Sequence, residues 1–283
     1  MFIRRIQFRA SSLKQATISR PFSANLSNEE LTKTLLERPP LIVEETVSDW
    51  KLQALSATLQ RSGKLDYLPQ GWHSIFCCPT VQTNQLGADG YENELAPPAP
   101  YISRMWGGST LKWNIKSEFL KVGEVLQKKT KISNVKLTEG KKSGKLAIIT
   151  IQSDYTNLSK KQTLLNESIN MIYRTQPFAN PNGNAEVPES PKELHLSPVT
   201  LLQVAGNHWR KSLVPSSLLL FRYSALTFNS HMIHYDLSYA LKEGFTHILV
   251  HGPLQAQLII DTIQLIFPNA FIEEFSYSGS FYT

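Results

Sequence analysis

The amino-acid sequence predicts an α+β protein built in two halves, each with helices and antiparallel strands. A short helical opening is followed by four strand-like runs in a row, a pattern typical of an antiparallel meander. Near the C-terminus, Pro253–Phe267 is apolar on nearly every side, which is typical of an enclosed helix. Of the 283 residues 41% are apolar, so the chain can build a sizeable buried core.

The first half of the chain contains the expected meander. Helices are expected at Glu29–Leu36 and Trp50–Leu59, and a loop rich in proline and glycine spans Leu68–Pro100. The four strand-like runs are Ser109–Asn114, Val125–Val135, Leu146–Tyr155 and Glu167–Arg174. The segment Thr138–Lys145, with the sequence TEGKKSGK, predicts a hairpin turn between two of them.

The clearest break in the chain is Ala179–Pro198, which collects prolines and asparagines without apolar periodicity and is interpreted as a linker. The second half then holds the apolar helix, preceded by strand-like runs at Val199–Ala205 and Leu218–Tyr223 and a short helix at Leu237–Glu243. Pro253 suits the first turn of the apolar helix, where its missing N–H is not needed. We expect an antiparallel sheet to wrap this helix.

Positive charge is concentrated at the N-terminus. The formal net charge is +6, yet residues 1–28 carry five basic and no acidic side chains, which leaves 24 basic against 23 acidic residues downstream. This distribution excludes a broadly basic, nucleic-acid-binding body. Residues 1–22 are rich in Arg, Ser and Ala, which predicts a mitochondrial transit peptide cut after Phe22 and a location in the mitochondrial matrix; a solvated basic arm is the alternative.

The cysteine content and the hydropathy pattern exclude two other classes of protein. Cys77 and Cys78 are adjacent and are the only cysteines, so the chain cannot build a disulfide framework or a four-cysteine zinc site, and a reducing compartment fits. The two most apolar stretches, 213–226 and 248–267, are interrupted by charged and amide side chains. We therefore expect no membrane span.

Polar residues that could carry chemistry gather in two short segments of the second half. Phe228–Asp236 has the sequence FNSHMIHYD and His247–Gly252 has the sequence HILVHG, so four of the seven histidines lie close to the apolar helix. A metal site is one alternative because the histidine spacings suit helical ligand pairs, but no glutamate completes an HExxH motif, and we expect no metal. The histidines expected to be solvated or core residues are His73, His195, His208 and His247.

Two stretches of sequence carry a resemblance to a known family. FRYSALTFNSHMIHYD with HGPLQAQLI resembles the type 2 3-hydroxyacyl-thioester dehydratases of mitochondrial fatty-acid synthesis, which belong to the MaoC-like, R-specific hydratase group. PQGWH at 69–73 and SRMWGG at 103–108 are similar to the N-terminal half of the same proteins. The resemblance covers most of residues 45–275. It implies a double hotdog fold, in which each half wraps a central helix in an antiparallel sheet.

The resemblance also implies a division into domains. Residues 23–178 are expected to form a degenerate N-terminal hotdog domain and residues 199–283 the catalytic one, joined by the linker at 179–198. Only sixteen residues follow Phe267, so the C-terminal half is expected to be incomplete or to borrow strands from elsewhere. The N-terminal half is expected to complete the acyl-chain tunnel in place of a second subunit, and a homodimer is left open.

The chemistry of the family places roles on three residues. Dehydration of a 3-hydroxyacyl thioester needs a base for the C2 proton, a donor for the C3 oxygen and a group that stabilises charge on the carbonyl. The histidine of the family falls on His234, and its aspartate falls on Asn229, which cannot supply a proton. His234 is therefore expected to serve both proton transfers, with Asn229 as a positioner. The backbone N–H of Gly252 is expected to bind the carbonyl oxygen.

The remaining residues near these motifs are expected to play lesser parts. His231 is a candidate helper, His251 and Arg222 are at most supports, and the large side chains Trp72, Trp106 and Tyr173 are expected to be architectural. The resemblance implies an enzyme that dehydrates (3R)-3-hydroxyacyl thioesters in mitochondrial fatty-acid synthesis, without a cofactor, with acyl carrier protein or coenzyme A as carrier. Two alternatives stay open: a hydratase of a short-chain or dicarboxylic enoyl-CoA, and a non-catalytic hotdog subunit.

Overall fold

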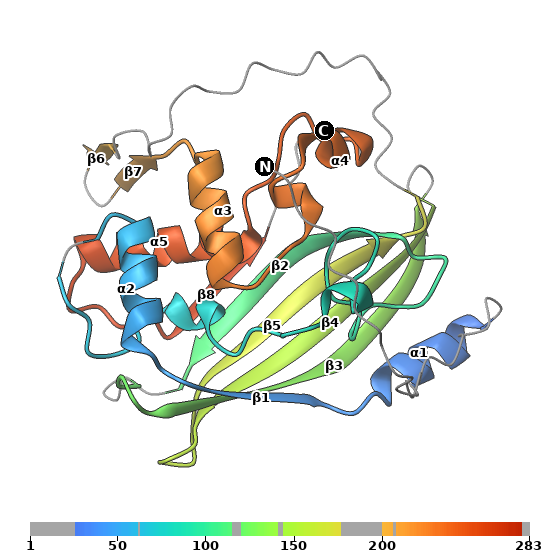
Figure 1. Ribbon diagram of the computed structural model, residues 1–283, viewed down its shortest axis with the longest axis horizontal. Helices are drawn as coiled ribbons and strands as arrows, with labels where there is room; N and C mark the ends of the chain where they lie inside the picture. The colour runs from blue at the N-terminus through green and yellow to red at the C-terminus, as the bar shows by residue number, and fades with distance from the viewer. Residues whose placement is uncertain are drawn as a thin grey trace, which may run out of the picture.

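A curved antiparallel sheet forms the larger part of the fold (Figure 1). The computed structural model describes residues 26–61, 63–114, 120–140, 144–176, 200–205 and 208–278. Within these ranges, six strands form one sheet in the order β1-β3-β4-β5-β2-β8. The strands are β1 (Leu41–Thr46), β2 (Ser103–Trp113), β3 (Val125–Gly140), β4 (Gly144–Asn157), β5 (Gln162–Arg174) and β8 (Glu274–Ser278). The predicted transit peptide and linker lie outside the described residues.

Helices lie beside this sheet, and Figure 1 shows α2, α3 and α5 gathered on one side of it. The helices are α1 (Asn28–Leu36), α2 (Asp49–Thr58), α3 (Ser217–Leu226), α4 (Leu237–Lys242) and α5 (Gly252–Ile266). Short 3-10 turns occur at Trp72–Ile75 (η1), Thr83–Gln85 (η2) and Met232–His234 (η3). A separate hairpin is formed by β6 (Thr200–Ala205) and β7 (His208–Ser212). None of the helices in the described part of the chain is long and apolar enough to cross a membrane.

The meander predicted for the first half is confirmed for β3, β4 and β5, whereas β2, the first of the four predicted strands, pairs with β5 and not with β3. β3, β4 and β5 pair antiparallel in sequence order, and Gly140 opposes Gly144 across the predicted hairpin turn. The expected strand at Ser109–Asn114 belongs to the longer β2, which begins at Ser103. The strand β1 was not predicted; its side chains alternate strictly between half-buried and exposed along Leu41–Thr46, as in a strand with one face toward the protein.

The strand predicted at Leu218–Tyr223 is wrong, because these residues lie in helix α3. Ser216 caps the helix by accepting a hydrogen bond from the backbone N–H of Leu219. The buried side chains are Leu219, Leu220, Tyr223 and Leu226, which recur at helical spacing. A continuous apolar run does not distinguish a buried strand from a helix by its periodicity, and here the serine cap was the signal that the prediction overlooked.

The main core joins the two halves of the chain. Sheet residues such as Leu111 and Leu126 belong to the same buried cluster as Leu219 of α3 and Leu254 of α5. Asp261 of α5 strengthens this connection, since its Oδ1 accepts a hydrogen bond from Trp72 Nε1 at 2.9 Å. The start of α5 is therefore held in a fixed position relative to the N-terminal half.

Helix α5 is less enclosed than the sequence predicts. Leu254 and Ile260 are completely buried, but Ile259 and Leu265 are 40% and 64% exposed. The reason is that, of the described strands, the C-terminal half contributes only β8 to the large sheet, where β8 pairs antiparallel with β2. This strand nevertheless matters for the site, because it places Tyr277 opposite Ser109 and close to the first turn of α5.

Candidate active site

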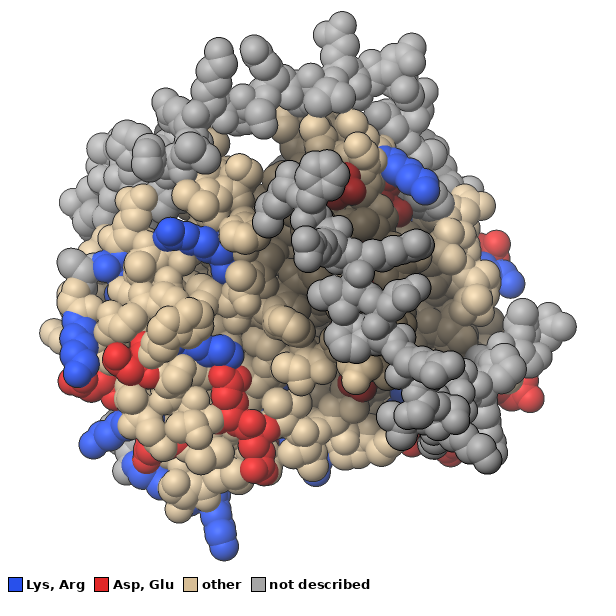
Figure 2. Space-filling view, viewed as in Figure 1, with Lys and Arg blue, Asp and Glu red and all other residues tan. Residues whose placement is uncertain are grey.

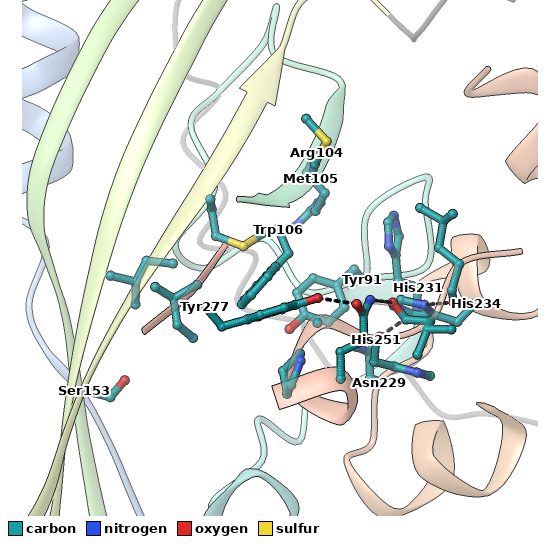
Figure 3. A pocket seen from close by; sticks show the side chains of 18 of the residues that line it. Tyr91, Arg104, Met105, Trp106, Ser153, Asn229, His231, His234, His251 and Tyr277 are labelled. Atoms are coloured by element: carbon teal, nitrogen blue, oxygen red, sulfur yellow. Dashed lines mark hydrogen bonds between the residues drawn. The ribbon is translucent and has the colours of Figure 1, made fainter. Parts of the chain in front are cut away.

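A cavity of about 1530 Å³ lies between the concave side of the sheet and helix α5. Figure 2 shows a hollow in this face of the molecule, with Lys and Arg side chains scattered over the face rather than gathered into one patch. One end of the cavity is polar and is lined by Asn229, His231, His234, His251 and Gly252. The remainder is mostly apolar, with Ile151, Ile169 and Met171 from the sheet and Ile259 and Ile263 from α5. The three site residues predicted from the sequence therefore share one cavity. Figure 3 shows the side chains of two of them, Asn229 and His234, near one another.

His234 is held by its Nδ1 atom. It lies at the end of η3, and its Nδ1 is 2.8 Å from the backbone carbonyl oxygen of Leu249. A carbonyl oxygen only accepts, so Nδ1 carries the hydrogen and the lone pair of the neutral ring is on Nε2. The ring is partly exposed to the cavity that it lines. A group with this geometry can accept a proton at Nε2.

Three neutral imidazoles meet at this end of the cavity. Burial lowers the pKa of His234 to about 4, although its hydrogen bond to Leu249 acts in the opposite direction. Burial, together with the neighbouring His234, lowers the pKa of His231 to about 3 and that of His251 to about 2. All three rings are therefore uncharged at neutral pH. A proton that His234 accepts is released readily, because the charged imidazole is poorly solvated here.

Asn229 shapes the loop that carries the two nearby histidines. It follows Phe228, which adopts a left-handed conformation with φ of 51°, and its backbone N–H donates to the carbonyl of Ser224 at 2.9 Å. Its side-chain Oδ1 accepts a hydrogen bond from the backbone N–H of His231 at 3.0 Å. Asn229 thus folds residues 229–234, which we call the acid–base loop, into a tight turn.

The N-terminus of α5 opens toward the cavity. Helices α1 to α4 are each capped by a side-chain oxygen, from Ser27, Ser48, Ser216 and Asp236. The N-cap of α5 is His251, whose side chain makes no capping hydrogen bond. Amide hydrogens in the first turn of a helix have no partner within the helix, and the helix dipole adds positive potential there. The Gly252 N–H can therefore bind an oxygen that develops negative charge.

Trp106 explains why position 252 must be glycine. A Cβ atom on Gly252 would lie 2.5 Å from Cδ2 of the Trp106 ring, which is closer than atoms can pack. The Trp106 ring in turn lies 5.1 Å from the ring of Tyr277 on β8. Tyr277 donates its hydroxyl hydrogen to Gln255 Oε1, in the first turn of α5. Trp106 was expected to be architectural, yet it lines the cavity and contacts the proposed carbonyl-binding residue.

Several residues near the motifs have other environments. Arg222 and His247 are exposed, and His73 is buried with its Nε2 3.8 Å from Glu167. His208 lies on β7, and His195 lies outside the described residues. Among the residues that the structure describes, no three His, Cys, Asp or Glu side chains are grouped so that they could hold a metal ion.

The sequence analysis gave Trp106 and His251 smaller roles than their positions in the structure support, and it did not single out Tyr277. The local signal for Trp106 is the pair of glycines that follows it, Gly107 and Gly108; His251 and Tyr277 have no such signal.

Comparison with known proteins identifies the family. A family model described as hydroxyacyl-thioester dehydratase type 2 matches residues 71–281, well over half of the chain. The chain belongs to the hydroxyacyl-thioester dehydratase type 2 family. The resemblance inferred from the sequence motifs is therefore confirmed, and the matched range includes every residue of the polar end of the cavity described above.

Two curated relatives of this dehydratase family member are enzymes that add or remove water. The mesaconyl-C(4)-CoA hydratase of Chloroflexus aurantiacus is 34% identical over 197 residues, which cover 69% of this chain and 63% of the relative. The chain thus spans less than two thirds of that relative's length. The mitochondrial hydroxyacyl-thioester dehydratase type 2 of Schizosaccharomyces pombe is 23% identical over 246 residues, or 81% of each protein.

The family member also resembles solved structures of the same class. The MaoC-like dehydratase of Phytophthora capsici superposes with a TM-score of 0.54 at 11% identity, covering 88% of this chain and 83% of the other. At this identity the likeness shows the fold alone. The α+β hotdog architecture expected from the sequence is confirmed.

Proposed function

We propose that this chain dehydrates (3R)-3-hydroxyacyl thioesters to trans-2-enoyl thioesters and that His234 carries the proton transfers. The observation that carries the proposal is the arrangement of two groups around one cavity. His234 has a free Nε2 lone pair, and the uncapped first turn of α5 lies at the same polar end. Each supplies one requirement of the reaction: a base, and a donor for the carbonyl oxygen.

In the proposed reaction, His234 Nε2 accepts the proton from C2 of the bound thioester. The negative charge that develops on the carbonyl oxygen is stabilised by the Gly252 N–H. The C3–O bond then breaks, and the protonated His234 returns its proton to the departing hydroxyl, which leaves as water. One proton and one hydroxide are removed in total, so no cofactor is consumed. Asn229 orients the hydroxyl and keeps the acid–base loop in shape.

The apolar part of the cavity supports an acyl chain as the variable part of the substrate. The volume of about 1530 Å³ exceeds the roughly 300–1,000 Å³ of ordinary small-molecule pockets, which suits a substrate with an extended apolar tail. We place the reaction in mitochondrial fatty-acid synthesis with acyl carrier protein as carrier. The mitochondrial relative of S. pombe and the basic, acid-free residues 1–28 support this placement.

A second candidate function is hydration of a short-chain or dicarboxylic enoyl-CoA. It is favoured by one observation, that the 34% identical relative is a mesaconyl-C(4)-CoA hydratase. The same groups would act in the reverse direction, because the addition of water passes through the same transition state. The substrate and the carrier distinguish the two candidates.

The test is an assay of the full chain and of two histidine variants. Each is supplied with (3R)-3-hydroxyacyl thioesters on acyl carrier protein and on coenzyme A, and with mesaconyl-C4-CoA. His234→Gln is expected to lower kcat/KM by about 10²–10⁴-fold, whereas His247→Gln, at an exposed position, leaves it unchanged. A preference for mesaconyl-C4-CoA would select the second candidate. A folded wild type without activity on any substrate would reject both and favour a non-catalytic hotdog subunit.

The proposed location has a separate test. Residues 1–28 fused to a fluorescent protein are expected to bring it into mitochondria, because the membrane potential draws a basic amphipathic segment inward. The matched control replaces the four arginines of the segment with glutamine and is expected to remain in the cytosol. A fusion that stays cytosolic with the arginines present would contradict the location.

A further inference from the structure

A buried carboxylate from the N-terminal half lies next to the acid–base loop. The side chain of Asp89 is only 6% exposed, and its Oδ2 lies 2.6 Å from Nε of Arg104 on β2. The same oxygen is 3.5 Å from Nε2 of His231. His231 lies between Asn229 and His234 in the sequence, and its ring centroid is 5.7 Å from that of His234. A charged pair of the N-terminal half therefore reaches the polar end of the cavity.

The backbone around Asp89 also accepts hydrogen bonds from the acid–base loop. Met232 donates its N–H to the Asp89 carbonyl at 2.9 Å, and Ser230 Oγ donates to the Gly90 carbonyl at 2.5 Å. Gly90 adopts a positive φ of 79°, and a Cβ atom there would collide with the carbonyl oxygen of Ser230. Only glycine allows so close an approach. Residues 87–91 and the acid–base loop are thus packed against each other without space between them.

The buried Nε2 atom of His231 indicates what the carboxylate does. His231 Nε2 is buried and forms no hydrogen bond with the described residues. Asp89 Oδ2, which already pairs with Arg104 at 2.6 Å, lies 3.5 Å from this nitrogen. Buried polar atoms are rarely left unpaired, and a small approach across the 3.5 Å gap would pair them. A carboxylate can only accept, so His231 would present Nε2–H and keep its lone pair on Nδ1.

Building on the proposed function, we propose that Asp89 is a positioning residue of the acid–base site. With Arg104 holding its carboxylate, Asp89 fixes the tautomer of His231 and keeps the acid–base loop, with Asn229 and His234, at the cavity. The N-terminal half has no Asn/His pair at the spacing of Asn229 and His234, yet through this contact it contributes to the chemistry. Position 229 holds an amide, and the carboxylate near the acid–base loop comes from position 89.

The kinetic test uses variants that separate function from folding. In Asp89→Leu/Arg104→Met both charges are removed together, because removal of one partner alone would leave a buried charge unpaired. We expect kcat to fall by about 100-fold, by analogy with the loss of a group that orients a catalytic residue, while KM changes less than about threefold and the thermal midpoint stays near that of the wild type. Asp89→Asn in the wild-type background keeps an acceptor oxygen and is expected to retain an intermediate kcat.

A matched control measures the cost of losing an ion pair elsewhere in the N-terminal half. Glu45→Gln breaks the 2.6 Å pair with Lys51, and it is expected to leave kcat unchanged. A double variant with His231→Gln provides the second check. If Asp89 acts through His231, the kinetic losses of Asp89→Asn and His231→Gln do not multiply. Fully multiplicative losses, or a folded Asp89→Leu/Arg104→Met variant whose kcat is within threefold of wild type, would overturn the proposal.

An activity-independent measurement separates this proposal from the proposed function. Nitrogen-15 NMR of the imidazole side chains distinguishes the two neutral tautomers, and His231→Gln assigns the signal. The wild type is expected to show His231 as Nε2–H, and the Asp89→Leu/Arg104→Met variant is expected to show a mixture of the two tautomers. An unchanged tautomer would reject the role of Asp89 even in an active enzyme. An inactive wild type with the expected tautomer change would reject the proposed function while leaving the positioning role supported.

Discussion

The imidazole rings of His234 and His251 stack face to face, with their centroids 3.7 Å apart and their planes inclined by 19°. His251 is itself held by a 2.8 Å hydrogen bond between its Nε2 and Ser224 Oγ. The stack covers one face of the proposed base and limits its rotation, in addition to the hydrogen bond at Nδ1. Two stacked rings in a buried site cannot both be charged at low cost, so protonation of His234 requires a neutral His251.

The first prediction concerns the pH dependence of the reaction. His234 acts as a base only when neutral, and burial lowers its pKa to about 4. We expect kcat/KM at pH 5.5 to stay close to its value at pH 7.5, whereas a solvated histidine with a pKa of about 6.5 would lose roughly tenfold. The measurement is the initial rate at low substrate concentration across this range. A tenfold decrease in a protein that stays folded would contradict the environment described for His234.

The second prediction concerns the pH dependence of stability. A histidine whose pKa is lowered by folding binds a proton more readily in the unfolded state, so its contribution to stability is full above about pH 6.5 and decreases below it. Burial lowers the pKa of His251 to about 2. Between pH 7.5 and 5.0 this residue alone should cost about 2 kcal/mol of unfolding free energy. Urea unfolding at both pH values measures the decrease in the wild type.

The control for this prediction is His251→Phe, which keeps a planar ring and removes the titrating group. Its unfolding free energy should decrease by about 2 kcal/mol less than that of the wild type between the two pH values. The comparison uses differences between pH values, so a uniform loss of stability in the variant does not affect it. Equal decreases in both proteins would mean that His251 titrates normally in the folded state.

The third prediction concerns Asn229. Its Oδ1 accepts the backbone N–H of His231, and an aspartate can accept the same hydrogen bond while also supplying a proton when protonated. We expect Asn229→Asp to retain or raise kcat, and Asn229→Ala to lower it by about 10²-fold or more. Steady-state kinetics of the two variants give the comparison. An alanine variant with an unchanged rate would remove Asn229 from the site.

The fourth prediction concerns the contact between Gly252 and Trp106. Gly252→Ala forces a Cβ into the Trp106 ring, so either the ring or the start of α5 must move. We expect kcat to fall by at least tenfold, because a displaced amide no longer meets the carbonyl oxygen. Trp106→Leu in the same chain creates space for the methyl group and should recover part of the loss. If the two substitutions multiply instead, the collision is not the cause.

The sequence was informative where a pattern has a local cause. The meander β3–β5 followed from alternating side chains and a glycine-containing hairpin, and α5 followed from its apolar run and Pro253. The prediction failed at Leu218–Tyr223, where a mostly apolar run fits strand and helix equally and only the Ser216 cap marks a helix. It also overestimated the enclosure of α5, because the number of strands that reach a helix depends on contacts distant in sequence.

The family, the order of most elements and the three residues of the proposed chemistry follow from the amino-acid sequence, since they depend on motifs that are short and contiguous. Three contacts are visible only in the folded chain: His251 stacks on His234, Trp106 excludes a side chain at Gly252, and Asp89 adjoins His231. The partners in these contacts come from segments far apart in the chain or from loops without periodicity. Their proximity arises from packing, which no local pattern encodes.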